Sequence, residues 1–115
     1  MTIFLGNLGE QLVATYLEEQ GFSIVARNFR VKQGELDIVA LKGDLLACVE
    51  VKTRSTVYFA TSCVVTASKQ KKIVTAAKHF RAYKGYLDKV VRFDVALVAY
   101  QSGEITYIDN AFYGS

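Results

Sequence analysis

Two apolar runs separated by only two residues, Gly43 and Asp44, predict a β-hairpin near the middle of the chain. The runs are ELDIVALK and LLACVEVKT, and each has the length of an ordinary strand. A glycine-led two-residue turn is a common hairpin connection because glycine readily adopts a positive φ. A turn of this length fixes the register of the hairpin, since it places Lys42 opposite Leu45.

Three charged residues, Asp37, Glu50 and Lys52, interrupt these apolar runs. The register places Asp37 directly opposite Glu50, and the alternation of side chains puts Lys52 on the same face. Facing carboxylates would have Cβ atoms about 4.5–5.5 Å apart, where like charges destabilise a sheet. Three arrangements relieve this repulsion: a shared proton, a salt bridge to Lys52, or a divalent cation. The alternative is an ion network on a solvated strand face. The opposite face of the hairpin is expected to carry Leu36, Ile38, Ala40, Ala47, Val49 and Val51.

Two helices and three further strands are expected around the hairpin. In chain order the predicted elements are a helix over about 2–20, a strand FSIVARNFRV, the hairpin, a helix over about 67–84, a strand VVRFDVALVAY and a strand EITYID. Thr66 or Ser68 is expected to cap the second helix, and Gly34 to take a positive φ in the loop before the hairpin. The apolar stripe of the second helix is predicted to be Ile73, Ala76, Ala77, Phe80 and Tyr83. This order predicts a mixed sheet with helices on its faces.

The 115 residues predict one domain across residues 1–115. No apolar run approaches the roughly 18 residues that a membrane span needs, and the N-terminus does not read as a signal peptide. We therefore expect a cytoplasmic protein without a membrane partner. Cys48 and Cys63 are expected to be buried free thiols, with a disulfide as the alternative.

Basic residues are concentrated in the second half of the chain. Between Ser68 and Phe93 a single acid, Asp88, accompanies eight basic residues: Lys69, Lys71, Lys72, Lys78, Arg81, Lys84, Lys89 and Arg92. This distribution is compatible with a polyanionic partner, and the alternative is a solvated helix face. Glu10 is a further acid of interest, because helical geometry puts it at the edge of the first helix's apolar stripe, from which it could reach over the edge of the sheet.

Four segments of the chain resemble a known family. Asp37 followed by Glu50-Val51-Lys52 resembles the PD-(D/E)xK nuclease constellation, with Leu36 in place of the proline. The segments GNLGEQLVATYLEEQGFSIVARNFR, GELDIVA, VEVKTR and VRFDVALV together resemble the uncharacterised bacterial YraN-like family. That family is similar to archaeal Holliday-junction resolvases, and the resemblance extends from Gly6 to about Ile108. It implies a restriction-endonuclease-like αβββαβ core, here with an extra C-terminal strand.

The resemblance also implies a set of site residues. Asp37 and Glu50 would be ligands of Mg²⁺ or Mn²⁺, and Lys52 the catalytic lysine. Glu10 matches the N-terminal helical glutamate of resolvase-like nucleases, which implies contact with the metal or its water. On the second helix we expect Lys69, Gln70 and Lys72 near the phosphates of a nucleic acid. Asp94 has no assigned role beyond a predicted salt bridge to Arg92 or Arg27.

These implications lead to three functional hypotheses. The first is a metal-dependent endonuclease that acts on structured or branched DNA. The second is a nucleic-acid-binding domain of the same fold without cleavage, and the third is an interaction domain in which the acids and Lys52 form only an ion network. A homodimer is also expected, because two active sites are needed to cut two strands and because TVYFATSCVV and AFYGS hold apolar residues that one layer of the fold leaves uncovered.

Overall fold

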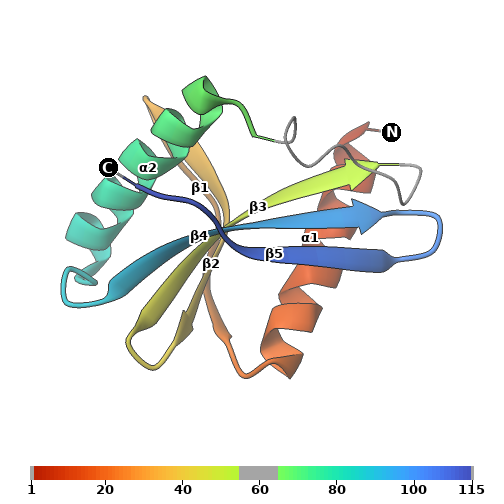
Figure 1. Ribbon diagram of the computed structural model, residues 1–115, viewed down its shortest axis with the longest axis horizontal. Coiled ribbons are helices and arrows are strands. Elements are labelled where there is room, and N and C mark those ends of the chain that lie inside the picture. The colour runs from red at the N-terminus through yellow and green to blue at the C-terminus, as the bar shows by residue number, and fades with distance from the viewer. Residues whose placement is uncertain (1, 55–64, 115) are drawn as a thin grey trace.

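The computed structural model describes residues 2–54 and 65–114, and the side chains from Asn7 onwards. Two helices and five strands follow one another along the chain (Figure 1). They are α1 (Thr2–Glu19), β1 (Ser23–Val31), β2 (Gly34–Lys42), β3 (Leu45–Arg54), α2 (Ala67–Lys84), β4 (Val90–Ala99) and β5 (Glu104–Phe112). The predicted αβββαβ order with an extra C-terminal strand is confirmed.

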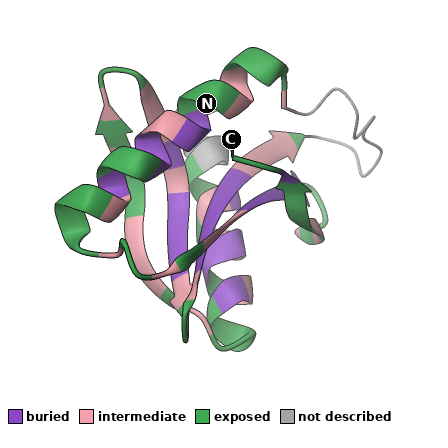
Figure 2. Ribbon diagram, turned by 60° about the vertical axis from the view of Figure 1, so that its left-hand side comes forward, coloured by how far each residue is buried: buried purple, intermediate pink, exposed green. Residues whose placement is uncertain are grey.

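The strands form one mixed sheet in the order β1-β2-β3-β4-β5. Only β3 and β4 run parallel, and α2 provides the crossover between them. The two helices cover opposite faces of this sheet. Figure 2 shows the buried positions along the central strands and on the sheet-facing sides of the helices. The fold is therefore a helix–sheet–helix arrangement, as the order of elements predicted.

The predicted hairpin register is confirmed. Lys42 pairs with Leu45, Val39 pairs with Cys48, and Gly43 has a φ of 60° in the turn. Backbone pairing between β2 and β3 continues to Ile38 and Val49. Beyond that pair, the side chain of Asp37 replaces a backbone acceptor, because its Oδ2 accepts a hydrogen bond of 2.9 Å from the N–H of Val51.

Leu36 lies on the other face of the sheet from the one predicted, because the regular pairing of β2 with β3 ends at Ile38. Leu36 was expected on the same face as Ile38, but it packs with Val39 in the core cluster under α2, whereas Ile38 packs in the cluster under α1. The regular alternation of side chains fails at Asp37, where the carboxylate takes over the strand's hydrogen bonding. Strict alternation requires a continuous ladder.

Helix α2 begins and ends as its sequence predicts. The Thr66 hydroxyl accepts a hydrogen bond of 3.2 Å from the N–H of Lys69, which confirms Thr66 as the N-cap, and Gly85 ends the helix in the left-handed conformation. The predicted stripe was wrong at one residue, because Tyr83 is 77% exposed and Val74 is buried instead. Tyr83 lies in the last turn, beyond the part of the helix that faces the sheet.

The prediction for Gly34 was also wrong, and the correction reveals a close approach between two elements. Gly34 pairs with Val31 as the first residue of β2, and it is not among the described residues with positive φ. A Cβ at this position would lie 2.2 Å from the carbonyl oxygen of Lys72. The glycine is required because the β1–β2 turn packs directly on the backbone of α2.

Several predictions fall on residues 55–64, outside the described residues. They concern Cys63 and most of TVYFATSCVV, whereas Cys48 is a buried free thiol as expected. In the C-terminal AFYGS segment, Phe112 is buried and Tyr113 is 80% exposed. Among the described helices, neither combines the length and the apolar character that crossing a bilayer requires.

Candidate active site

The hairpin positions Asp37 at one end of the sheet. Its carboxylate is held between β2 and β3 by the hydrogen bond from the Val51 N–H. This bond orients the carboxylate through a strand of the scaffold, so that its position depends on the backbone and not on a flexible partner. Asp37 therefore lies beside Glu50, the residue that precedes Val51 in β3, as the predicted register requires.

Glu50 is the most buried charged group of this cluster, at 5% exposure. Two ammonium groups lie near its Oε2, the Nζ of Lys52 at 3.4 Å and the Nζ of Lys69 at 3.7 Å. Lys52 comes from the same strand two residues on, whereas Lys69 extends from the first turn of α2. The predicted convergence of Asp37, Glu50 and Lys52 therefore includes a residue of α2 as well.

Glu50 acts strongly on the titration of Asp37. Burial, followed by the charge of Glu50, raises the pKa of Asp37 to about 8, although the hydrogen bond from the Val51 N–H acts in the opposite direction. A hydrogen bond between the Asp37 and Glu50 carboxyl groups also contributes to the raised pKa. In the absence of a cation, a proton on Asp37 at neutral pH relieves the repulsion, which is one of the three arrangements expected from the sequence.

Glu10 lies at the margin of this cluster. Its side chain is 13% exposed, and its buried Oε1 has no hydrogen-bond partner among the described residues, although the Nη2 of Arg27 lies 3.8 Å away. Burial raises the pKa of Glu10, while a hydrogen bond from Asn28 and the charge of Arg27 lower it. The charge of Glu10 contributes to the raised pKa of Asp37, so the two groups share one electrostatic environment.

The donor set fits a cation that needs few protein ligands. Over residues 2–54 and 65–114, no three Asp, Glu, His or Cys side chains group closely enough to hold a metal ion together. Asp37 and Glu50 are a pair of carboxylates, and Mg²⁺ is often bound by one or two carboxylates, with waters and substrate phosphates as its other ligands. The orphaned Oε1 of Glu10 is a further acceptor without a partner. We take the pair as the candidate cation site and Glu10 as its neighbour.

The three residues expected near phosphates are in different environments. Lys69 contacts Glu50, as described above. Gln70 donates its Nε2–H to the carbonyl of Val65 at 3.1 Å, so its amide group supports the start of α2. Lys72 is exposed and lies along a groove beside the β1–β2 turn.

Comparison with known proteins identifies the family of this chain. The model of a family described as "Uncharacterised protein family UPF0102" matches residues 9–98. The chain belongs to the UPF0102 family. It is 41% identical over 114 residues to a UPF0102 protein of Alkaliphilus metalliredigens, covering 97% of this chain and 100% of that protein. It is 46% identical over 112 residues to a UPF0102 protein of Geobacter sulfurreducens, covering 94% and 88% of the two chains.

Asp94 of the UPF0102 chain belongs to a separate network. It is fully buried and accepts two hydrogen bonds of 2.9 Å from the Arg92 guanidinium, which confirms Arg92 over Arg27 as its partner. It also accepts hydrogen bonds from the Tyr107 hydroxyl and the Asn110 N–H. Asp94 pairs with Val49, on the face covered by α1, whereas Glu50 lies on the face covered by α2. Asp94 is therefore a structural link between β4 and β5.

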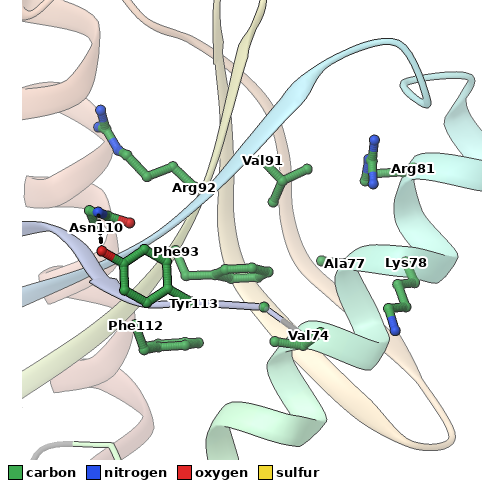
Figure 3. Close-up of a pocket in the computed structure, with 11 residues that line it drawn as sticks. Val74, Ala77, Lys78, Arg81, Val91, Arg92, Phe93, Asn110, Phe112 and Tyr113 are labelled. Carbon is green, nitrogen blue, oxygen red and sulfur yellow. Dashed lines mark hydrogen bonds between the residues drawn. The ribbon is translucent and has the colours of Figure 1, made fainter.

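A cavity of about 200 Å³ lies at the other end of α2 (Figure 3). The rings of Phe93 and Phe112 stack within it at 5.2 Å, and the Tyr113 hydroxyl accepts a hydrogen bond from the Asn110 amide. The described residues that line the cavity include no carboxylate. The guanidinium of Arg81 is bound to three backbone carbonyls, so the UPF0102 chain uses it to hold the turn after α2.

Sequence reasoning missed two neighbours of the UPF0102 site. Arg27 and Asn28 of β1 both interact with Glu10. Asn28 has a φ of 55°, a conformation that asparagine adopts more readily than most residues. The only signal in the sequence is an asparagine between residues of high strand propensity, which marks a break in the strand without indicating its partner.

Metal-free UPF0102 protein is expected to lose stability as the pH rises from about 4 to about 8. The folded state keeps a proton on Asp37 that the unfolded state releases near the ordinary value, so this contribution is present at low pH and is lost as the pH passes the folded pKa of about 8. The slope is at most about 1.4 kcal/mol per pH unit. Asp37→Asn should remove this pH dependence, because asparagine does not titrate. Its amide oxygen can still accept the hydrogen bond from the Val51 N–H, so the fold around it is kept. Urea unfolding in EDTA at several pH values measures the difference, and parallel profiles for the two proteins would contradict it.

Proposed function

We propose that this UPF0102 protein is a divalent-cation-dependent endonuclease that cleaves phosphodiester bonds in structured or branched DNA. The observation that carries the proposal is the convergence of Asp37 and Glu50 with the ammonium group of Lys52, 3.4 Å from Glu50. The buried Glu50 and the half-buried Asp37, with a lysine beside them, suit a reaction at a phosphate, which brings negative charge into the site. The proposal implies a cytoplasmic location and, for the cutting of two strands, a homodimer.

Asp37 and Glu50 would hold Mg²⁺ or Mn²⁺ between β2 and β3. When bound, the ion would offset the charge of the scissile phosphate and lower the pKa of a water molecule. The chain's contribution is preorganisation, since Val51 fixes Asp37 and burial in β3 fixes Glu50. Binding would displace the proton from Asp37, because a carboxylate ligand must be deprotonated.

Lys52 would act on the substrate through its charge. Its side chain is 24% exposed, so the ammonium group is accessible from the solvent side of Glu50. A cation at this position stabilises negative charge that develops on a phosphoryl oxygen, and it can hold an attacking water in place through its N–H donors. Lys69, 3.7 Å from the same carboxylate, adds a second positive charge to the site.

A cleavage screen tests the proposal. Purified protein is incubated with four-way junctions, flaps, duplex and single-stranded DNA in Mg²⁺ or Mn²⁺ over a range of salt concentrations. The expected result is cleavage of at least one branched substrate that stops on addition of EDTA and is absent in Asp37→Ala. If every substrate stays intact with both ions, the endonuclease proposal is wrong.

A nucleic-acid-binding module without cleavage is the second candidate. The observation that favours it is that Glu50 already has two cationic partners, and that a proton on Asp37 removes the repulsion between the two carboxyl groups. Such a site is electrostatically satisfied without a metal. DNA binding that persists in Asp37→Ala and Glu50→Ala, together with no cleavage by the wild-type protein, would identify this function.

A further inference from the structure

The turn between β1 and β2 and the first half of α2 enclose a groove beside the candidate active site. This hairpin groove has a volume of about 280 Å³ and is open to solvent. Its chemistry comes from five side chains: Arg30, Lys32, Glu35, Lys69 and Lys72. We propose that the hairpin groove binds the phosphodiester backbone of DNA and leads it to Glu50, an inference that rests on the proposed nuclease function and adds its substrate-binding surface.

The charge of the hairpin groove favours a polyanion. Four of the five side chains are cationic, and the acid, Glu35, is paired with Arg30 at 3.0 Å. The described lining contains no second carboxylate, so Lys32, Lys69 and Lys72 outnumber the acids that could neutralise them. Lysine ammonium groups bind phosphate as compact point charges, and the lysines come from two different elements, one on each side of the groove.

The hairpin groove is continuous with the acidic pair. Lys69 lines the groove and at the same time lies 3.7 Å from the Oε2 of Glu50. A backbone that follows the lysines from Lys32 to Lys69 therefore arrives at the carboxylate. The Nζ of Lys52 lies 3.4 Å from the same carboxylate oxygen. The cationic side chains of the groove therefore lead to Glu50, where the proposed cleavage would take place.

The walls of the hairpin groove are fixed by backbone packing. Gly34 sits so close to α2 that a Cβ there would lie 2.2 Å from the Lys72 carbonyl oxygen. The start of α2 is fixed in turn by the Thr66 cap and by the hydrogen bond from Gln70 to Val65. The spacing between the two walls is therefore set before a ligand binds, which lowers the entropic cost of binding.

The charge and the open shape of the hairpin groove favour a polymer. Sites that enclose whole small molecules are mostly apolar. This groove is lined by charged side chains and open to solvent, so it can hold part of a backbone that continues beyond both ends. Contacts of this kind carry affinity without reading sequence.

The test compares two double variants of the full chain with equal loss of charge. Lys32→Gln/Lys72→Gln removes two exposed lysines of the hairpin groove, and Lys71→Gln/Lys84→Gln removes two exposed lysines of α2 outside it. Binding of a fluorescent four-way junction is measured by anisotropy in EDTA between about 50 and 200 mM salt. In the groove variant the plot of the logarithm of the binding constant against the logarithm of the salt concentration should be less steep by about 2. The wild-type protein should therefore lose roughly tenfold more affinity over this range than the variant does.

The control variant should keep the wild-type slope. Equal slopes for the two double variants, or no binding of DNA by the wild-type protein in EDTA, would overturn the inference. A polyglutamate peptide of matched charge should compete poorly, and competition equal to that of DNA would overturn the assignment to phosphodiesters. Circular dichroism confirms that each variant is folded. This test measures no cleavage, so it is independent of the nuclease activity. If the slopes differ but the protein does not cleave DNA, the groove proposal holds and the nuclease proposal fails. If the protein cleaves DNA but the slopes are equal, only the groove proposal fails.

Discussion

Glu50→Gln is expected to reduce Mn²⁺-dependent cleavage of a branched DNA by about 10³-fold or more. Glu50 is 5% exposed and lies beside Asp37 and two lysines. The substitution removes one of the two carboxylates proposed to hold the cation and leaves Asp37 as the remaining one of the pair. Removal of a single preorganised electrostatic contact in an active site costs about 10²–10³-fold, and loss of a metal ligand should cost at least as much.

The control for this prediction is Glu104→Gln at the exposed start of β5, which should leave cleavage unchanged. Initial rates are measured at saturating Mn²⁺, with thermal unfolding to confirm that both variants are folded. If folded Glu50→Gln protein cleaves within about tenfold of wild type, Glu50 has no part in catalysis, and the active site must be sought elsewhere.

Asp94→Ala is expected to have the largest effect on stability, a loss of about 3–5 kcal/mol in the free energy of unfolding. The substitution leaves the Arg92 guanidinium without its partner and removes the acceptor of the Tyr107 hydroxyl and the Asn110 N–H. The Arg92 side chain is 26% exposed, so water can partly replace Asp94 there, whereas the Tyr107 hydroxyl and the Asn110 N–H each lose a charged acceptor. Breaking a buried ion pair costs about 3–5 kcal/mol, and each buried polar group left without a partner costs about 1–3 kcal/mol.

Urea unfolding measures the loss, with Glu104→Ala as the matched control, because Glu104 is an exposed acid of the same strand pair. The control should change the free energy of unfolding by less than about 0.5 kcal/mol. A loss below about 1 kcal/mol for Asp94→Ala would show that the network is dispensable for folding, and would make a functional role for Asp94 the better explanation.

The placement of the acidic pair was predictable because it depends on local rules. A two-residue turn determines the register of a hairpin, and the register brings Asp37 beside Glu50 whatever the rest of the chain does. The order of elements likewise determined the mixed sheet with helices on both faces. Thr66 was one of two predicted caps, with Ser68, because a hydroxyl just before an α-helix has a defined partner, the N–H three residues later; the structure selects Thr66.

The parts that could not be predicted depend on tertiary contacts. The contact between Lys69 and Glu50 requires the position of α2 over the sheet, which no spacing in the sequence contains. The departure of Leu36 from the expected face follows from the hydrogen bond between Asp37 and Val51, a competition between side chain and ladder. Gly34 was predicted to have a positive φ in a turn. Its actual role, the close approach of β2 to the backbone of α2 at Lys72, leaves no mark in the neighbouring sequence.

Calorimetry and electron paramagnetic resonance of Mn²⁺ binding can show whether Asp37 and Glu50 form a divalent-cation site. The wild-type chain should bind a single ion, release about one proton as it does so below pH 8, and lose affinity about tenfold per pH unit as the pH falls, because Asp37 must give up its proton. The Asp37→Asn/Glu50→Gln double variant should not bind Mn²⁺. Absence of binding by the wild-type protein, or equal binding by the double variant, would show that Asp37 and Glu50 do not form a cation site.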